Sequence, residues 1–202
     1  MQSNEHDASF RAYFERWSES FQNDLLGQQK RIFNGFLEMW GELCRDVVVS
    51  GRSVAYVEIS LLRSDYYADG VARVIMEAFD ENWIFGSPVS VVDAQMPILS
   101  EIFRCHRESI LQEARKYIGK IPAYTVKKEM LEELPKIDKT LAMILEMNSE
   151  ELCSHIAFEN SPFEELVQLS LGEYRRFQYE INLSDPKSDN PKKGSEQSQI
   201  IS

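Results

Sequence analysis

The fold of this chain is decided by residues 54–79, VAYVEISLLRSDYYADGVARVIMEAF. Apolar and polar side chains alternate over residues 55–61, and the same alternation returns over residues 72–78. Alternation with a period of two among β-prone residues is typical of strands that bury one face. Residues 64–70, between the two segments, end in an Asp-Gly pair, which favours a tight turn. The sequence therefore predicts an antiparallel β-hairpin here.

Helical periodicity precedes the hairpin. Large apolar residues recur every three or four positions from Phe10 to Phe21 and again from Phe33 to Val47. Such spacing places these side chains on one face of a helix. We expect two helices in this part of the chain, with the second ending near Gly51, because glycine readily adopts the left-handed conformation that closes a helix.

Helical periodicity also follows the hairpin. The apolar residues predict one helix over residues 97–119, another over residues 135–147 and a short one over residues 149–158. The clearest local signal is Ser161-Pro162-Phe163-Glu164. A serine cap, a proline in the first turn and a glutamate after it are typical of a helix N-terminus. We therefore expect a last helix from Ser161 to Phe177, with its apolar face turned inward.

These elements predict an α+β fold that is predominantly helical. A lone hairpin is only marginally stable in water, so its apolar face has to be covered by the flanking helices. We expect a small antiparallel hairpin or meander over about residues 53–85, with a third short strand at residues 83–85, packed against the N- and C-terminal helices. Residues 1–182 should form a single globular domain. Residues 183–202, which are polar and have no apolar period, should form a disordered tail.

Composition and cysteine usage point to a protein of the cytoplasm. The chain of 202 residues is 43% hydrophobic, enough for a substantial core. Its N-terminus lacks the basic start and apolar stretch of a secretory signal, and no apolar run approaches the roughly 20 residues that span a bilayer. Cys44, Cys105 and Cys153 are widely spaced and form no CxxC pair. We expect them to be small buried side chains rather than disulfide partners.

The negative charge is concentrated in two windows. The chain has a net charge of -11; residues 74–103 hold five acids and residues 140–174 hold seven, without a Lys or Arg in either window. The rest of the chain is close to neutral. A focused acidic surface attracts basic proteins and repels nucleic acid, whose recognition requires a basic stripe. We therefore expect a basic protein partner, no nucleic-acid binding and no membrane insertion.

Two groups of residues are candidates for binding that partner. Arg63, Tyr66 and Tyr67 belong to the predicted turn of the hairpin, and Tyr and Arg are common anchors of protein interfaces. The second group consists of acids of the second window. These are Glu146, Glu150, Glu151 and Glu159. Both groups also have a plainer interpretation, as tyrosines that cover a sheet edge and as a solvated helix face.

Signals for an enzyme are weaker. The sequence has no glycine-rich phosphate loop and no local nucleophile motif, and we expect no cofactor. Glu151 and His155 lie four residues apart and, with Cys153 between them, are weak candidates for a metal site, although such a pair is half a site. His106 lies on an apolar helix stripe, where a hydrogen-bonded core histidine is the usual finding.

The leading hypothesis from the sequence is a non-enzymatic, acidic, cytoplasmic protein-binding module, either an adaptor or a neutraliser of a basic partner. One alternative is a metal-dependent or other enzyme with a site near His106 and His155. The other alternative is a helical scaffold that assembles with itself into a homo-oligomer, because Trp17, Trp40 and the many phenylalanines could exceed what one core buries.

Overall fold

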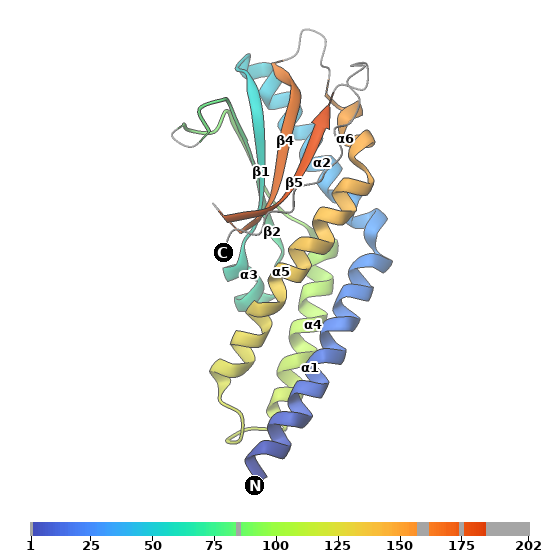
Figure 1. The fold of residues 1–202 in the computed structure, drawn as a ribbon, viewed down its shortest axis with the longest axis vertical. Coiled ribbons are helices and arrows are strands. Elements are labelled where there is room, and N and C mark those ends of the chain that lie inside the picture. Colours follow the sequence, from blue (N-terminus) through green and yellow to red (C-terminus); the bar gives the residue numbers. More distant parts are fainter. Residues whose placement is uncertain (1, 84–85, 157–161, 174–175, 185–202) are drawn as a thin grey trace.

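The computed structural model describes residues 2–83, 86–156, 162–173 and 176–184 (Figure 1). Helices and one mixed sheet make up the fold, which confirms the predicted α+β class with mostly helical content. The elements are α1 (Gln2–Gly27), α2 (Gln29–Ser50), β1 (Val54–Leu61), α3 (Arg63–Asp69), β2 (Arg73–Phe79), β3 (Ser90–Gln95), α4 (Pro97–Arg115), α5 (Ala123–Met147), α6 (Ser149–Ser154), β4 (Phe163–Glu173) and β5 (Arg176–Ser184). None of the described helices is long and apolar enough to cross a membrane.

The sheet has five strands in the order β3-β2-β1-β4-β5. β1 and β2 form the predicted antiparallel hairpin, with Val57 opposite Ala78 and Ile59 opposite Met76. β3 is the antiparallel neighbour of β2 on one side. On the other side β1 pairs in parallel with β4, and β4 pairs with β5. A parallel pair requires a long crossover, and the chain between β3 and β4 supplies it with α4, α5 and α6.

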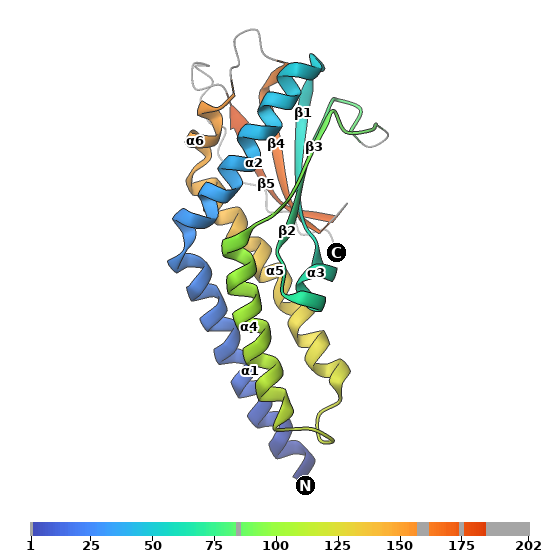
Figure 2. The ribbon, with the colours of Figure 1, turned by 180° about the vertical axis from the view of Figure 1, so that it is seen from behind.

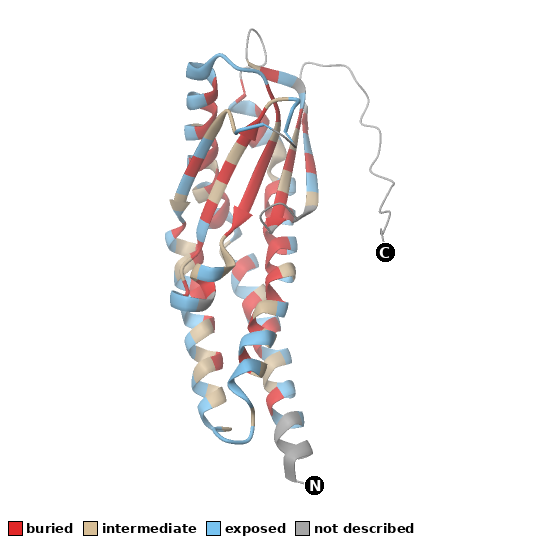
Figure 3. Ribbon diagram, turned by 90° about the vertical axis from the view of Figure 1, so that its left-hand side faces the viewer, coloured by how far each residue is buried: buried red, intermediate tan, exposed pale blue. Residues whose placement is uncertain are grey.

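The helices cover one face of the sheet. α2 packs against β2 and β3, and α5 and α6 pack against β4 and β5. The strands lie in front of α2 in Figure 1 and behind it in Figure 2. α1, α4 and the first half of α5 continue beyond the sheet as a helical bundle (Figure 1). In Figure 3 the helices carry their exposed residues on the outside and their buried residues toward the sheet or one another.

The link between β1 and β2 differs from the prediction. Instead of a tight turn, residues 63–69 form the short helix α3. The Asp-Gly signal marks the end of this helix, where Gly70 has a φ of 67°. A Cβ atom at this position would lie 2.9 Å from the backbone of Arg104 in α4, so both the conformation and the packing require glycine.

The predicted C-terminal helix is wrong. The chain from Phe163 onward forms β4 instead, and β5 follows it. Val167, Leu169 and Leu171 are buried at alternate positions, which is the period of a strand. The carbonyl of Pro162, expected at a helix start, accepts a hydrogen bond of 2.8 Å from the backbone of Val54 in β1. Pairing with β1 therefore outweighs the local capping signal, a case of tertiary contacts overriding propensity.

Other predicted boundaries also shift. Trp83 lies in a turn and residues 84–85 lie outside the described part, so the third strand is β3 and begins at Ser90. Pro135 does not open a helix but lies inside α5. β5 continues to Ser184, whereas the rest of the predicted tail, from residue 185, lies outside the described residues. The single-domain assignment stays a prediction.

One apolar core connects the bundle to the sheet. Trp17 of α1 is 4% exposed and Trp40 of α2 is 1% exposed. Their indole nitrogens donate hydrogen bonds to the carbonyls of His106 at 2.8 Å and Leu152 at 3.0 Å. Both tryptophans are thus covered and satisfied within one chain, while self-assembly stays a prediction.

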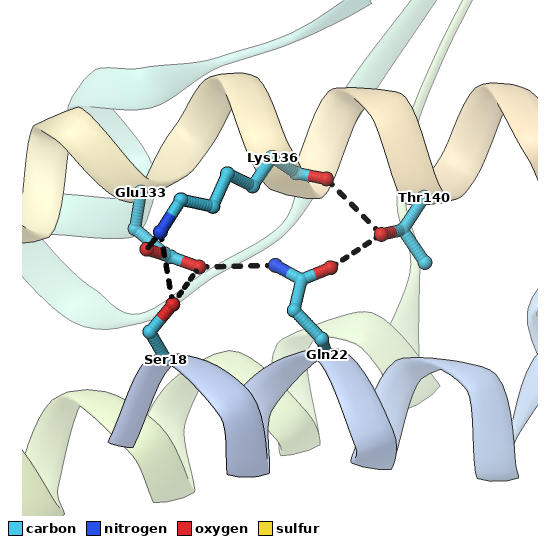
Figure 4. A network of polar contacts seen from close by, with 5 residues as sticks. All are labelled: Ser18, Gln22, Glu133, Lys136 and Thr140. Carbon is cyan, nitrogen blue, oxygen red and sulfur yellow. Dashed lines mark hydrogen bonds and ion pairs between the residues drawn. The ribbon is translucent and has the colours of Figure 1, made fainter. Parts of the chain in front are cut away.

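A buried polar network joins α1 to α5 (Figure 4). The carboxylate of Glu133, 1% exposed, accepts hydrogen bonds from Ser18 at 2.7 Å, Gln22 at 3.0 Å and Lys136 at 2.9 Å. Thr140 lies beyond Gln22 and donates to its side-chain carbonyl. A buried charge is tolerated when its oxygens are satisfied in this way, so the network specifies how the two helices align.

Candidate partner-binding face of the sheet

The face of the sheet opposite the helices is the candidate functional site. Successive residues of a strand point to opposite faces, and the set that includes Val57 and Ile59 is buried against the helices. The other set forms what we call the open face. In the described strands it comprises Tyr56, Glu58 and Ser60 of β1, Arg73, Ile75, Glu77 and Phe79 of β2, Val91 and Asp93 of β3, Leu166, Gln168 and Ser170 of β4, and Glu180 and Asn182 of β5.

A row of acidic side chains crosses the middle of the open face. The strand register places Glu77 opposite Glu58, Glu58 opposite Ser170, and Ser170 opposite Glu180. Glu58 is 4% exposed, Glu77 is half-buried and Glu180 is exposed. Directly opposed side chains of opposite charge stabilise a sheet by about 0.2–1 kcal/mol, whereas like charges destabilise it. Taken alone, the pairing of Glu58 with Glu77 disfavours the sheet, so strand pairing does not explain this acidic row.

Trp83 extends from the loop between β2 and β3 to the acidic row. Its indole nitrogen donates a hydrogen bond to Glu58, and its ring stacks on Tyr56 with centroids 5.6 Å apart and 27° between the planes. Trp83 is 36% exposed, in contrast to the covered tryptophans of the core. An exposed indole attracts cations through its π face, and neighbouring carboxylates strengthen that attraction.

The loop that carries Trp83 is held in place at its first residue. Asp80 accepts hydrogen bonds from the backbone of Asn82 at 2.9 Å and from Arg52 at 2.9 Å, and its carbonyl accepts from the backbone of Trp83 at 3.1 Å. The Asn82 hydrogen bond and the Arg52 guanidinium lower the pKa of Asp80, so its carboxylate stays ionised. Trp83 is therefore positioned by a turn and an ion pair.

An open cavity of about 510 Å³ continues the open face toward β5. Its lining combines the aromatic ring of Tyr56 with Leu166, which is 55% exposed, and with the amides of Gln168 and Asn182. Glu164 also lines the cavity and accepts a hydrogen bond of 3.2 Å from Ser53. The open face thus offers an aromatic ring, an exposed apolar side chain, amides and carboxylates side by side.

Part of the acidic charge counted in the first window is neutralised. Asp93 accepts two hydrogen bonds from Arg73, at 2.8 Å and 2.6 Å, and these lower the pKa of Asp93. Asp80 is paired with Arg52, as described above. Both arginines come from outside the window, so a count along the sequence overstates the acidity of this part of the surface. Glu77, another acid of this window, lies opposite Glu58 in the acidic row.

Comparison with family models, with curated proteins and with solved structures finds no match. Function therefore has to be argued from the residues themselves.

The interface anchor expected at Tyr66 is wrong. Tyr66 is 0% exposed and its ring packs edge-on against Phe103, with centroids 4.8 Å apart. Burial also raises the pKa of Tyr66. Arg63 reaches Asp138 of α5 at 3.5 Å, and the side chain of Tyr67 lies outside the described part. Because the expected turn is a helix packed on α4 and α5, the tyrosine that seemed exposed belongs to the core.

The acids predicted to bind a partner lie away from the open face. Glu146 ends α5, and Glu150 and Glu151 begin α6; all three are exposed. Glu159 lies outside the described residues. α6 packs on the helix-covered side of β5, so these glutamates form a second acidic surface. Their role in binding stays a prediction.

The weak metal candidates do not come together. Cys153 is 9% exposed and belongs to the core, whereas Glu151 and His155 are exposed. Within the described residues, no three His, Cys, Asp or Glu side chains are grouped so that they could hold a metal ion. Among the thiols, Cys44 is buried as expected but Cys105 is exposed, contrary to the prediction.

His106 lies in α4, whereas His155 directly follows α6. His106 stacks on Phe21 with centroids 4.4 Å apart, and its Nε2 lies 2.8 Å from Asp24 in α1. It is the hydrogen-bonded core histidine that the sequence favoured. His155 follows α6 and lies beside Gly41 of α2. The two histidines thus lie on different elements, and the enzyme alternative stays a prediction.

Sequence reasoning missed the residues that make the open face distinctive. Glu58 and Glu77 occupied the polar positions of the predicted hairpin, and a register count could have placed them opposite each other. Ser170 and Glu180 could not have been added, because their segment was assigned to a helix. For Trp83 the sequence predicted a short strand over residues 83–85, and no local signal indicates where the indole points.

Proposed function

We propose that this protein is a non-enzymatic protein-binding module that holds a basic partner against the open face. The carrying observation is the acidic row beside a partly exposed aromatic pair: half-buried Glu77 and exposed Glu180, with buried Glu58 between them, next to Trp83 and Tyr56. Aromatic faces attract Arg and Lys side chains by about 0.5–2 kcal/mol, and carboxylates bind guanidinium groups in a bidentate geometry. A basic protein segment carries Arg and Lys side chains, which both the aromatic faces and the carboxylates attract.

Three further features support a protein as the ligand. Val91, opposite Glu77, and Leu166, in the cavity beside Tyr56, are 47% and 55% exposed, and exposed apolar side chains near charged ones are typical of protein interfaces. The net charge of -11 accelerates the encounter with a basic surface. The ion pair of Arg52 with Asp80 fixes Trp83 before binding, which lowers the entropy lost on association. Both an adaptor and a neutraliser of a basic protein would use such a surface.

The test is affinity capture from native lysate at low and at high salt, with a double variant as the decisive comparison. Trp83→Ala combined with Glu180→Lys removes the exposed indole and inverts one charge of the acidic row. We expect a basic protein to be captured by the wild type, released by salt, and lost from the variant.

The matched control is Glu101→Lys, which makes the same charge change at an exposed residue of α4. It should capture the same partner as the wild type. Equal capture by the double variant would contradict the proposal, as would equal losses in the double variant and in the control. A purified partner can then be titrated while the emission of Trp83 is followed.

A further inference from the structure

A second site lies on the outer side of α2, independent of the open face. There the structure has a groove of about 840 Å³, bounded by α2, by His155 at the end of α6 and by Phe163 at the start of β4. Apolar side chains form most of its walls. They are Leu37, Cys44, Val48, Val49 and Phe163. Val48 and Val49 are 56% and 87% exposed, so the groove is an uncovered apolar surface of ligand-binding size.

Two nitrogen groups converge on one point of this groove. A Cβ atom at Gly41 would lie 3.6 Å from Nη1 of Arg45 and 3.9 Å from Nδ1 of His155. These are ordinary van der Waals distances, so both groups lie close to the helix backbone at Gly41. In the described part of the chain, neither the guanidinium nor the imidazole makes a hydrogen bond or an ion pair. Their capacity to bind a ligand is therefore unused.

The other polar groups of the groove are a neutral thiol and two side chains that precede Gly41 along α2. Burial raises the pKa of the Cys44 thiol to about 12, so this thiol remains neutral and contributes an apolar wall. Asn34 and Glu38 also line the groove, and Glu38 is three residues before Gly41, about one turn of the helix. The point where the two nitrogen groups meet therefore has Glu38 on one side along α2 and the apolar walls at Cys44, Val48 and Val49 on the other.

We propose that this groove binds an amphiphilic carboxylate, a small molecule with one carboxylate and a hydrocarbon body. The carboxylate accepts hydrogen bonds from Arg45 and His155 above Gly41, and the hydrocarbon body covers the exposed valines. Arginine suits the carboxylate because its fork of N–H groups matches two oxygens. Burial of the hydrocarbon supplies the rest of the affinity. Glu38 disfavours a ligand with a second carboxylate.

Calorimetric titration of the full chain with decanoate, decan-1-ol and decylamine, each below its aggregation limit, tests this inference. The three probes share the same hydrocarbon body and differ in the head group. Decanoate should bind roughly tenfold or more tightly than the other two, since a charge-assisted hydrogen bond distinguishes it. Arg45→Gln should remove that preference. Equal binding of all three probes would overturn the proposal, and so would the absence of binding by decanoate.

Two variants separate loss of the site from loss of the fold. Gly41→Leu fills the groove while favouring the helix, because leucine has a higher helix propensity than glycine, and it should abolish decanoate binding with an unchanged circular dichroism spectrum. Arg31→Gln, at an exposed residue of α2 outside the groove, should bind decanoate like the wild type. Trp83→Ala should also bind decanoate normally, so failure of this inference and failure of the proposed function give different results.

Discussion

At the residue scale, the hydroxyl of Tyr66 is the group in the core that most clearly lowers the stability of the fold. Within the described residues this hydroxyl is buried and has no hydrogen-bond partner. An unsatisfied buried donor costs about 1–3 kcal/mol, so Tyr66→Phe should raise the free energy of unfolding by about 1 kcal/mol. Urea unfolding measures the change. The control is Tyr179→Phe, which removes a hydroxyl that donates to the carbonyl of Pro135 at 3.2 Å and should lower that free energy. A loss of stability in both variants would contradict the prediction.

Cys44 makes stability depend on alkaline pH. Burial raises the pKa of its thiol from 9.0 to about 12, so above pH 9 the unfolded chain ionises this thiol while the folded chain keeps it protonated. The contribution is fully present below pH 9 and is lost as the pH rises from 9 toward 12. Cys44→Ala should therefore show a shallower fall in unfolding free energy between pH 9 and 10.5 than the wild type, measured by urea unfolding at each pH. Cys105→Ala, at an exposed thiol, should keep the wild-type slope.

At the element scale, the sequence correctly predicts those elements in which the spacing of apolar residues distinguishes a helix from a strand. β1 and β2 alternate apolar residues with more polar ones, and the apolar set that includes Val57, Ile59 and Met76 is buried. Apolar and polar residues also alternate in β4 from Val167 to Leu171, but the capping signal at Ser161 led to a helix being predicted there. A strand that pairs in parallel with one more than a hundred residues earlier carries no local mark of its partner. β4 was missed for that reason, and β5, its antiparallel neighbour, was missed with it.

The ion pair between Arg52 and Asp80 should control the position of Trp83. Arg52→Gln removes the cation that holds the first residue of the loop, at 2.9 Å. We expect acrylamide to quench Trp83 more strongly in this variant, while the urea midpoint stays unchanged because exposed ion pairs add little stability. Arg73→Gln breaks a similarly exposed pair with Asp93 and should leave the quenching unaltered. Equal quenching in the two variants would show that this ion pair does not hold the loop.

At the scale of the whole molecule, the candidate site is assembled from segments that the sequence cannot relate. Glu58 and Glu77 lie in one hairpin, and their pairing follows from its register. Glu180 joins them only through β4, whose register with β1 includes an irregularity between Val54 and Tyr56. Counting charges within a window also left out Arg52 and Arg73, which lie outside the first window. These two arginines neutralise Asp80 and Asp93. Long-range pairing, not composition, decides where the acidic surface is.

Long-range contacts also determine whether the bundle and the sheet unfold together. One continuous apolar cluster runs from Phe10 in the bundle to Leu183 in β5, and the network around Glu133 links α1 to α5. Bundle and sheet therefore share buried contacts that neither keeps alone, and we expect them to unfold in a single transition. Fluorine-labelled tryptophans give one NMR signal each, so Trp17 reports on the bundle and Trp40 on the region beside the sheet. Both native signals should disappear at the same urea concentration. An earlier loss at Trp17 would mean that the bundle unfolds by itself and that the chain contains two cooperative units.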